Sequence, residues 1–244
     1  TDGRYLEQSK RELDNNIFKS FNISDLPKLP WSQYLKENYC FGYDPKLFTI
    51  DKLNLFFKGE LHLSKVPDNL VDQIWLNRTL PCSKVYLHET EFAGQSYVDK
   101  VALCRKSVRD YLADSMIITA PDSICWLLNL RANDVSYTPL MLGKIIIDID
   151  QVYLFTNLSR IDQEIIDERP DIVILAEEEF AKKLSETKKV LIDNRSTSIY
   201  ITDLLSGKVV ECINDPCQLA KARKNNIEIE HAINFHIKDA VALC

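Results

Sequence analysis

The sequence has little of what usually marks an active site. It contains no Gly-x-Ser-x-Gly nucleophile elbow, and its six glycines are too scattered to form a phosphate-binding loop. No apolar run approaches the roughly 18 residues that a membrane helix needs, and no cluster of Lys and Arg is interleaved with aromatic residues as in nucleic-acid-binding proteins. The formal net charge of −6 also disfavours nucleic acid, and we expect the chain to bind neither nucleic acid nor a membrane.

The cysteines do not suggest a zinc or redox site. Their number is seven, so at least one is unpaired, and they form no Cys-x-x-Cys pair. We therefore expect reduced thiols, most of which pack in the interior, and a cytoplasmic location. Four Asn-x-Ser/Thr sequons favour the alternative, a glycosylated secreted chain. These sequons begin at Asn22, Asn77, Asn157 and Asn194.

Two histidines near the carboxyl end, His231 and His236, stand beside acidic residues and raise the question of a metal site. A spacing of five residues turns the second side chain by about 140° from the first on a helix, so the two cannot share one ion. We expect them to be packing or surface residues. Asp148 and Asp150 alternate along a predicted strand, where they either hold a cation or, as is more common, end the strand in water.

Residues 228–244 predict an amphipathic helix. Its apolar positions recur at helical spacing on one face, namely Ile229, Ile233, Ile237, Ala240, Val241 and Cys244. No glycine cap, proline or polar run closes this helix, and the chain opens on Thr-Asp-Gly-Arg-Tyr without an initiator Met. We therefore expect the sequence to be a piece of a longer protein.

Hydrophobic periodicity predicts an α/β protein with a mixed sheet. Helices are expected at residues 4–15, 45–58, 98–112, 123–130 and 176–186, and strands at 116–120, 144–150, 152–155, 171–175, 190–194, 198–205 and 208–213. Residues 22–31 are interpreted as a proline-rich loop and residues 71–84 as a connection between units. The Asp-Pro step within residues 214–226 is interpreted as a second hinge.

Residues 119–139 carry a motif that resembles the second domain of the Xaa-Pro aminopeptidases of the three-domain cytosolic type. The family pattern is Thr-Ala-x-Asp-x-Ile-x-Trp-Leu-x-Asn-Leu-Arg-Gly-x-Asp followed by a proline. The matching residues are Asp122, Ile124, Trp126, Leu127, Asn129, Leu130, Arg131, Asp134 and Pro139. Ala132 stands where the family prefers Gly, which puts in doubt any backbone conformation that needs a positive φ there.

Further blocks agree with the family in the same order along the chain. Residues 1–14 look like the end of the family's first domain, residues 69–78 and 96–112 fit its linker and the first helix of its second domain, and residues 222–244 look like the opening helix of its catalytic domain. The resemblance therefore spans the whole chain. It divides the chain into 1–80, part of domain I with a linker, 81–217, a creatinase-like α/β domain II, and 218–244, the start of a pita-bread catalytic domain.

The resemblance implies an enzyme that removes the N-terminal residue from peptides with proline in the second position. In this family two divalent metal ions, usually manganese, are held in the catalytic domain, so the ligands are expected beyond Cys244. No catalytic residue and no metal ligand is then expected in this chain, which alone would be inactive. A homodimer of the full-length protein stays open. So does the alternative that the parent is an aminopeptidase-like binding module without metals.

Little functional content carries over residue by residue. Arg4 occupies the Arg position of the family's Thr-Asp-Gly-Arg-Tyr motif, which implies contact with the substrate, and a guanidinium suits that task because its rigid fork orients a carboxylate or carbonyl. The alternative for Arg4 is an ion pair on a turn with Asp2 or Glu7. Asn129, Arg131 and Asp134 are interpreted as a network that fixes the loop and an interdomain surface, with the cleft rim as their alternative place.

Overall fold

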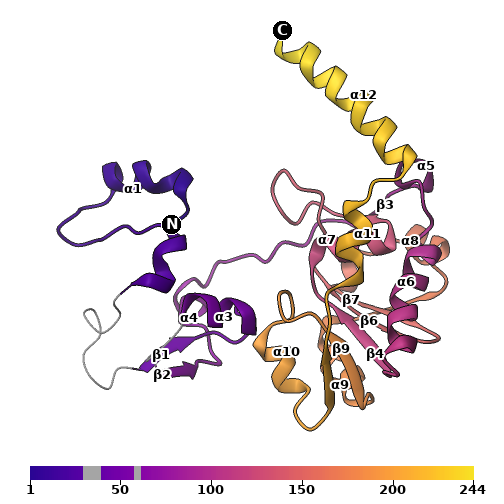
Figure 1. Ribbon diagram of the computed structural model, residues 1–244, viewed down its shortest axis with the longest axis horizontal. Coiled ribbons are helices and arrows are strands. Elements are labelled where there is room, and N and C mark those ends of the chain that lie inside the picture. Colours follow the sequence, from indigo (N-terminus) through magenta and orange to yellow (C-terminus); the bar gives the residue numbers. More distant parts are fainter. Residues whose placement is uncertain (30–39, 58–61) are drawn as a thin grey trace. The chain divides into compact units, whose positions relative to one another are not determined.

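The computed structural model describes residues 1–29, 40–57 and 62–244, and the chain divides into two compact units, Thr1–Leu76 and Asn77–Cys244. Figure 1 shows the elements of both units. Pro30 and Trp31 of the predicted proline-rich loop, and Lys58 at the end of the predicted second helix, lie outside the described residues.

The first unit begins with a 3-10 turn, η1 (Gly3–Tyr5), that continues into α1 (Leu6–Glu12), so the helix predicted at 4–15 is confirmed at a shorter length. A second 3-10 helix, η2 (Ile23–Lys28), follows. The strands β1 (Cys40–Tyr43) and β2 (His62–Lys65) pair in parallel, and α3 (Ile50–Phe56) lies between them in the chain. The helix predicted at 45–58 is thereby confirmed in its central part.

Half-buried aromatic side chains pack together in this first unit. The ring of Phe57, just after α3, lies 4.5 Å from that of Phe41 on β1 and 6.0 Å from that of Phe48. The boundary between the units, after Leu76, falls within the connection predicted at 71–84, although α4 (Leu70–Ile74) overlaps the start of that segment. The Asn69 side chain accepts a hydrogen bond from the backbone N–H of Val71 at 2.9 Å and so begins that helix.

The second unit is built on a six-stranded mixed sheet in the order β10-β9-β4-β6-β7-β8. Its strands are β4 (Ser115–Ile118), β6 (Lys144–Asp148), β7 (Val152–Phe155), β8 (Ile172–Leu175), β9 (Lys189–Ile192) and β10 (Val209–Cys212). Only β6 runs against its neighbours β4 and β7, and the other adjacent pairs are parallel. The predicted α/β fold with a mixed sheet is confirmed.

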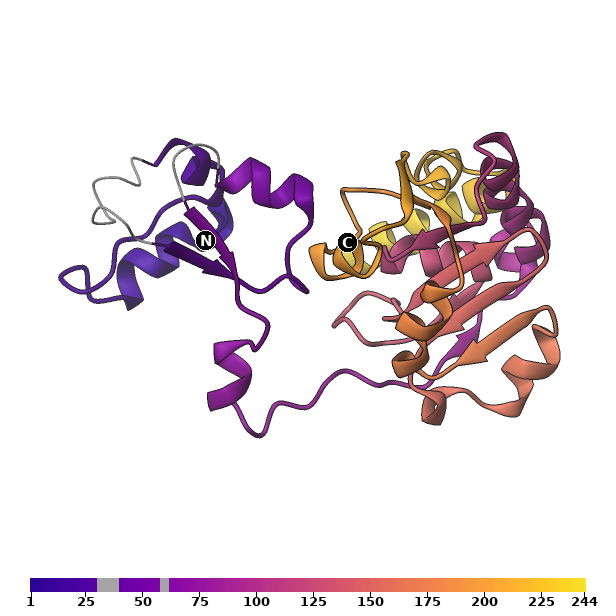
Figure 2. The ribbon, with the colours of Figure 1, turned by 90° about the horizontal axis from the view of Figure 1, so that it is seen from below.

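Helices cover both faces of this sheet, as Figures 1 and 2 show. The strands alternate their side chains between two cores, so that Met116 and Ile118 of β4 enter one core while Ile117 enters the other. The first core also contains side chains of α6 (Tyr97–Asp110), α7 (Pro121–Leu128), α8 (Gln163–Glu168) and α11 (Pro216–Ala222). The second contains those of α9 (Phe180–Ser185) and α10 (Ile199–Leu204). Burial on both faces explains why these strands are rich in β-branched residues.

Smaller elements complete this unit. The two-residue strands β3 (Tyr86–Leu87) and β5 (Leu130–Arg131) pair antiparallel, and α5 (Thr90–Ala93) follows β3. The 3-10 helices η3 (Leu158–Arg160) and η4 (Glu177–Glu179) precede α8 and α9. The last helix is α12 (Asn226–Leu243). No helix within the described residues has both the length and the apolar character needed to cross a bilayer.

Two predictions for the second unit are wrong. Residues 198–205 were expected to be a strand but form α10, because the Ser198 side chain caps the helix by accepting from the N–H of Ile201 at 3.4 Å, and Ile201 and Leu205 share one buried face. The expected hinge at 214–226 contains α11. Asp215 accepts from the N–H of Cys217 at 2.8 Å and Pro216 occupies the first helical position, so the Asp-Pro step begins a helix.

The start of α12 is fixed to α5. Asn225 and Glu228 form a reciprocal capping box, and the Asn225 amide also donates to the carbonyl of Ala93 at 2.8 Å. Gly94, which ends α5 with a φ of 66°, lies so close that an added Cβ would stand 2.3 Å from the Asn225 side chain. The glycine thus makes room for the residue that anchors α12.

We predict that Gly94→Ala destabilises the chain more than Gly207→Ala. Both glycines have positive φ, but nothing lies within 4 Å of a Cβ at Gly207, where φ is 81°. Gly207→Ala should cost about 1–2 kcal/mol for the left-handed backbone alone, and Gly94→Ala about 1–3 kcal/mol more through overlap with Asn225. Urea unfolding of both variants checks this. Equal losses would show that the approach of Asn225 is not tight.

Candidate functional site

The motif at 119–139 spans α7, β5 and the loop that follows, and its first part binds α7 to α11. The Ser123 hydroxyl donates to the Asp215 carboxylate, and Asp122 accepts from Gln218 and Lys221. Burial alone would raise the pKa of Asp122, but the contact with Lys221 holds it below its ordinary value. These contacts hold the amino end of α7 in place.

Three cationic side chains donate to the carbonyl groups at the other end of α7. Lys100 of α6 donates to the carbonyl of Trp126 at 3.1 Å, Arg131 of β5 to that of Cys125 at 2.5 Å, and Arg169 after α8 to that of Leu128 at 3.1 Å. The carbonyl of Cys125 also accepts from the N–H of Asn129, whereas carbonyls nearer a helix end lack such a partner, and the helix dipole favours positive charge there. We call these three residues the cationic cap of α7.

Asn129 ends α7 in the left-handed conformation, with a φ of 50°. Its side-chain oxygen accepts from the Lys100 ammonium at 2.6 Å, and its amide donates to the carbonyl of Gln95 at 2.9 Å. Its backbone carbonyl accepts from the N–H of His88 at 2.8 Å. Asn tolerates this conformation better than most residues, so one residue ends the helix and links it to the neighbouring elements.

Burial changes the charge balance around the cationic cap. Lys100 is only 2% exposed and its ammonium lies 4.6 Å from the centre of the Trp126 ring. Burial lowers the pKa of Lys100 to about 8, although the nearby carboxylate of Glu228 opposes the shift. Burial, together with the charges of Arg131 and Lys100, lowers the pKa of His88 to about 4. His88 is therefore neutral at physiological pH.

Asp134 belongs to a second network, centred on a buried ion pair. Its carboxylate lies 2.6 Å from the Arg160 guanidinium, and the side chains are 0% and 3% exposed. It also accepts from the hydroxyl and the N–H of Ser83, at 2.8 and 3.0 Å, and from the N–H of Leu142 at 2.8 Å. Burial alone would raise the pKa of Asp134, but these hydrogen bonds hold it below its ordinary value.

Arg4 lies on the surface of the first unit. Its side chain is 82% exposed and forms an ion pair with Asp2, in which the closest nitrogen and oxygen are 2.6 Å apart. The Asp2 side chain also accepts from the Arg4 N–H at 3.0 Å. This is one of the two pairings considered as the alternative to substrate contact. An exposed pair of this kind is weak enough for a ligand to replace.

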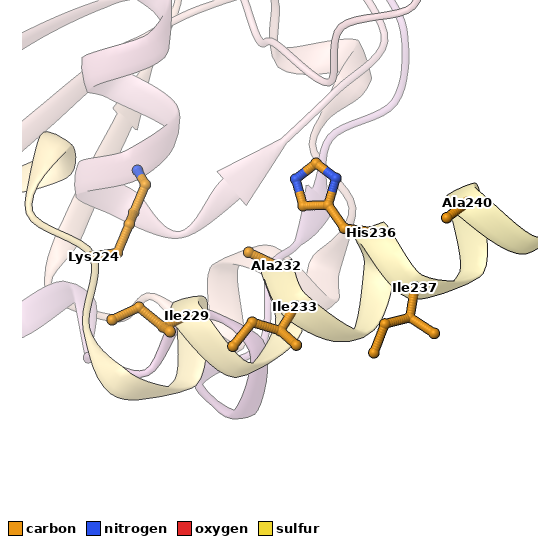
Figure 3. Close-up of a pocket in the computed structure, with 7 residues that line it drawn as sticks. All are labelled: Lys224, Ile229, Ala232, Ile233, His236, Ile237 and Ala240. Atoms are coloured by element: carbon orange, nitrogen blue, oxygen red, sulfur yellow. The ribbon is translucent and has the colours of Figure 1, made fainter.

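The two histidines of α12 have different surroundings. His231 packs its ring 5.5 Å from that of Phe92 in α5. His236 lines an open groove of about 500 Å³ with Ile229, Ile233 and Ile237, and Figure 3 shows these three isoleucines in a row along the helix.

Within residues 1–29, 40–57 and 62–244, no three or more His, Cys, Asp or Glu side chains gather closely enough to hold a metal ion. The Asp148 side chain accepts from the N–H of Asp150 at 2.8 Å, in the turn between β6 and β7.

These elements agree with a known family. A model of the Creatinase/Prolidase N-terminal domain matches residues 77–228. The chain belongs to this family. The match begins where the second unit begins and includes both networks and the start of α12.

Relatives of this creatinase/prolidase-type chain include whole aminopeptidases. Over its full length the chain is 30% identical to Xaa-Pro aminopeptidase 1 of Dictyostelium discoideum and 27% identical to Xaa-Pro aminopeptidase ApepP of Drosophila melanogaster, covering 42% and 43% of them. The solved X-prolyl aminopeptidase from Caenorhabditis elegans, a cytosolic enzyme with a di-nuclear active site, aligns with the whole chain and 43% of its own, with a TM-score of 0.83 and 25% identity. The chain thus spans about two fifths of the length of these relatives, and the resemblance predicted from the motifs is confirmed.

The structure joins some of the residues singled out from the sequence and separates others. Asn129 and Arg131 meet at the end of α7, whereas Asp134 belongs to the Arg160 network. Lys100, Arg169 and Arg160 were not foreseen, since they are isolated cations in the sequence. Of the non-glycine residues between 119 and 142, Asn129 and Tyr137 have positive φ and Ala132 does not, so alanine fits where the family prefers glycine.

We predict that Asp134→Asn lowers the free energy of unfolding by about 3–5 kcal/mol, because the change leaves the buried Arg160 charge uncompensated. Asp110→Asn is the matched control: Asp110 pairs with Lys106, but both side chains are more than half exposed, so its loss should stay within about 1 kcal/mol. Denaturant unfolding at pH 7 measures both. Similar small effects would contradict a structural role for the Asp134 network.

Protonation of His88 should destabilise the fold in acid. Because the folded-state pKa of about 4 lies below the ordinary 6.5, the unfolded chain binds the proton first, and stability is lost as pH falls from 6.5 through 4. We predict that the free energy of unfolding of His88→Gln, relative to that of the unchanged chain, increases as the pH falls from 8 to 4.5. Urea unfolding across this range tests it, with pH 8 as the reference for lost packing. A difference that does not vary with pH would contradict the prediction.

Proposed function

We propose that this chain is the amino-terminal, non-catalytic portion of a metal-dependent Xaa-Pro aminopeptidase. The observation that carries the proposal is alignment over the entire chain with enzymes of that name, together with the TM-score of 0.83 to the Caenorhabditis elegans enzyme. The substrates would be peptides with proline in the second position. Their X-Pro bond is a tertiary amide without an N–H, which calls for a dedicated site.

Two divalent metal ions, manganese in this proposal, would supply an attacking hydroxide and polarise the scissile carbonyl. The described residues do not fit such a centre, since no suitable group of His, Cys, Asp or Glu is present among them. The ligands would therefore lie in a catalytic domain beyond Cys244. The location would be cytoplasmic, as for the Caenorhabditis elegans enzyme, which is cytosolic.

Residues 218–244 would open that catalytic domain, with residues 1–80 and 81–217 as the end of domain I with its linker and domain II. Support comes from α12. Its apolar side chains Ile233, Ile237 and Val241, which recur every four residues on one face, are 57%, 59% and 73% exposed. An amphipathic helix is stabilised chiefly by burial of such a face. A domain that packs on this face would provide that burial.

Arg4 would contact the peptide. Its guanidinium is exposed, paired with Asp2 and 5.8 Å from the centre of the Tyr5 ring, so a peptide carbonyl or carboxylate can reach it and compete with Asp2 for the same donors. Asn129, Arg131 and Asp134 would support the reaction indirectly, by keeping the end of α7 and its loop rigid. Most of their hydrogen bonds go to the backbone of the second unit, as described above.

Hydrolysis of an Arg-Pro-Pro peptide tests this function. The full-length protein with manganese should release the first residue, chelator should abolish the release, and the 244-residue chain should be inactive in both conditions. Full-length protein carrying Arg4→Ala should show a raised KM, whereas Lys10→Ala, which removes another exposed ion-paired cation of the first unit, should not. A full-length protein that stays inactive with metal would contradict the proposal and favour an aminopeptidase-like binding module.

A further inference from the structure

The loop between β5 and β6 carries at its tip an aromatic residue with an unusual backbone conformation. Tyr137 has a φ of 60° and a wholly exposed side chain. The turn at the tip is closed by the N–H of Thr138, which donates to the carbonyl of Val135 at 3.1 Å. Bulky residues other than glycine rarely adopt positive φ, and such residues gather at functional positions where the surrounding structure imposes the strain.

The base of this loop is rigid. On one side Asp134 is held by the buried pair with Arg160. On the other, the N–H of Leu142 donates to the same carboxylate at 2.8 Å and the N–H of Met141 donates to the Cys125 sulfur at 3.1 Å. Both ends of the loop are therefore tied to one buried group and to α7. A tip so held can present a side chain without first ordering the loop, which lowers the entropic cost of binding.

The tip has the composition of a contact surface. No charged residue occurs between Asp134 and Lys144. Besides Tyr137, Val135 and Leu142 are 39% and 38% exposed. Interface centres are enriched in aromatic residues and depleted of charge. A free peptide with charged termini would call for an ionic partner at the tip, so a folded apolar surface suits it better.

The loop and α12 extend from the same end of the second unit. In Figure 1 the loop is the pink turn beside the α7 label, at the end of the unit from which α12 leaves, and Figure 2 shows it again at the edge of the unit. Ile233 and Ile237 on α12 are 57% and 59% exposed. Two elements that carry exposed apolar side chains therefore extend from one end of the second unit.

We propose that Tyr137 is a second anchor for the domain that α12 opens, its ring packing into an apolar surface of that domain while α12 forms the covalent junction. This rests on the proposed function, because the occupant is the segment following Cys244. The relatives align over 42% and 43% of their lengths, which leaves more than half of each for such a domain. Together with α12, the loop would fix the orientation of the catalytic domain at two separate points.

Hydroxyl-radical footprinting of the full-length protein and of the 244-residue chain tests the inference. In the full-length protein the modification of Tyr137 and Ile237 should fall several-fold. Tyr111, 43% exposed and located just after the carboxyl end of α6, is the internal control and should not change. Protection of Ile237 without protection of Tyr137 would overturn the inference and leave the proposed function standing. No protection of either would overturn both. Protection of Tyr137 in the 244-residue chain that grows with concentration would point to a second copy instead and overturn the inference.

A matched pair of variants gives an independent reading. Tyr137→Asn removes the ring but keeps a residue that tolerates positive φ. Leu112→Asn does the same at another exposed apolar position, where φ is 49° and the side chain is 85% exposed. Neither should lower the Tm of the 244-residue chain. In the full-length protein Tyr137→Asn should lower the Tm and Leu112→Asn should not, and equal Tm values for the two would overturn the inference.

Discussion

The second unit depends on how the carboxyl end of α7 is satisfied. A helix end leaves carbonyl oxygens without partners, and a buried polar group without a partner costs about 1–3 kcal/mol. Lys100 and Arg169 donate to two of these oxygens, and Arg131 donates to the carbonyl of Cys125, which also accepts from the N–H of Asn129. Because the three donors come from α6, β5 and the segment after α8, satisfying one helix end also fixes the positions of three other elements.

This arrangement explains why a segment rich in functional residue types contains no reacting group in the chemistry that we propose. Trp126 provides a ring surface for a buried ammonium, Asn129 provides the left-handed helix end, and Arg131 returns a donor to the helix that it follows. Each of these tasks requires its residue type, since the aromatic face, the tolerance of positive φ and the fork of donors are not interchangeable. A motif can therefore be specific because a rigid turn needs those residues.

The sequence predicted the elements that have a simple period and missed those that depend on partners far along the chain. Strands such as β6 and β7 are continuous apolar runs, so their existence followed from the residues alone. The strand predicted at residues 198–205 was wrong because β-branched residues suit a strand locally, whereas the Ser198 cap and the packing of Ile201 impose a helix. The hinge predicted from the Asp-Pro step at 215–216 was wrong because the residue pair that marks a turn can also start a helix.

The candidate site shows the same limit in stronger form. Asn129, Arg131 and Asp134 could be singled out by the motif, but Lys100 lies 29 residues from Asn129 and Arg160 lies 26 residues from Asp134. Nothing in local sequence indicates such pairs, since a buried cation looks like any surface lysine or arginine until the fold encloses it.

The junction of α12 with the second unit fixes only the start of this helix. Its first turn is tied down by the capping box of Asn225, by the bond from Asn225 to Ala93 and by the packing of His231 on Phe92. A helix whose first turns are fixed and whose later side chains are exposed has a set direction but no lateral support. In the arrangement that we propose, the following domain would provide lateral support through contacts at some distance from the junction, because an angular error at the first turn grows with distance along an 18-residue helix. A rigid loop at the same end of the sheet can supply such a contact, and the buried Asp134–Arg160 pair is what makes that loop rigid.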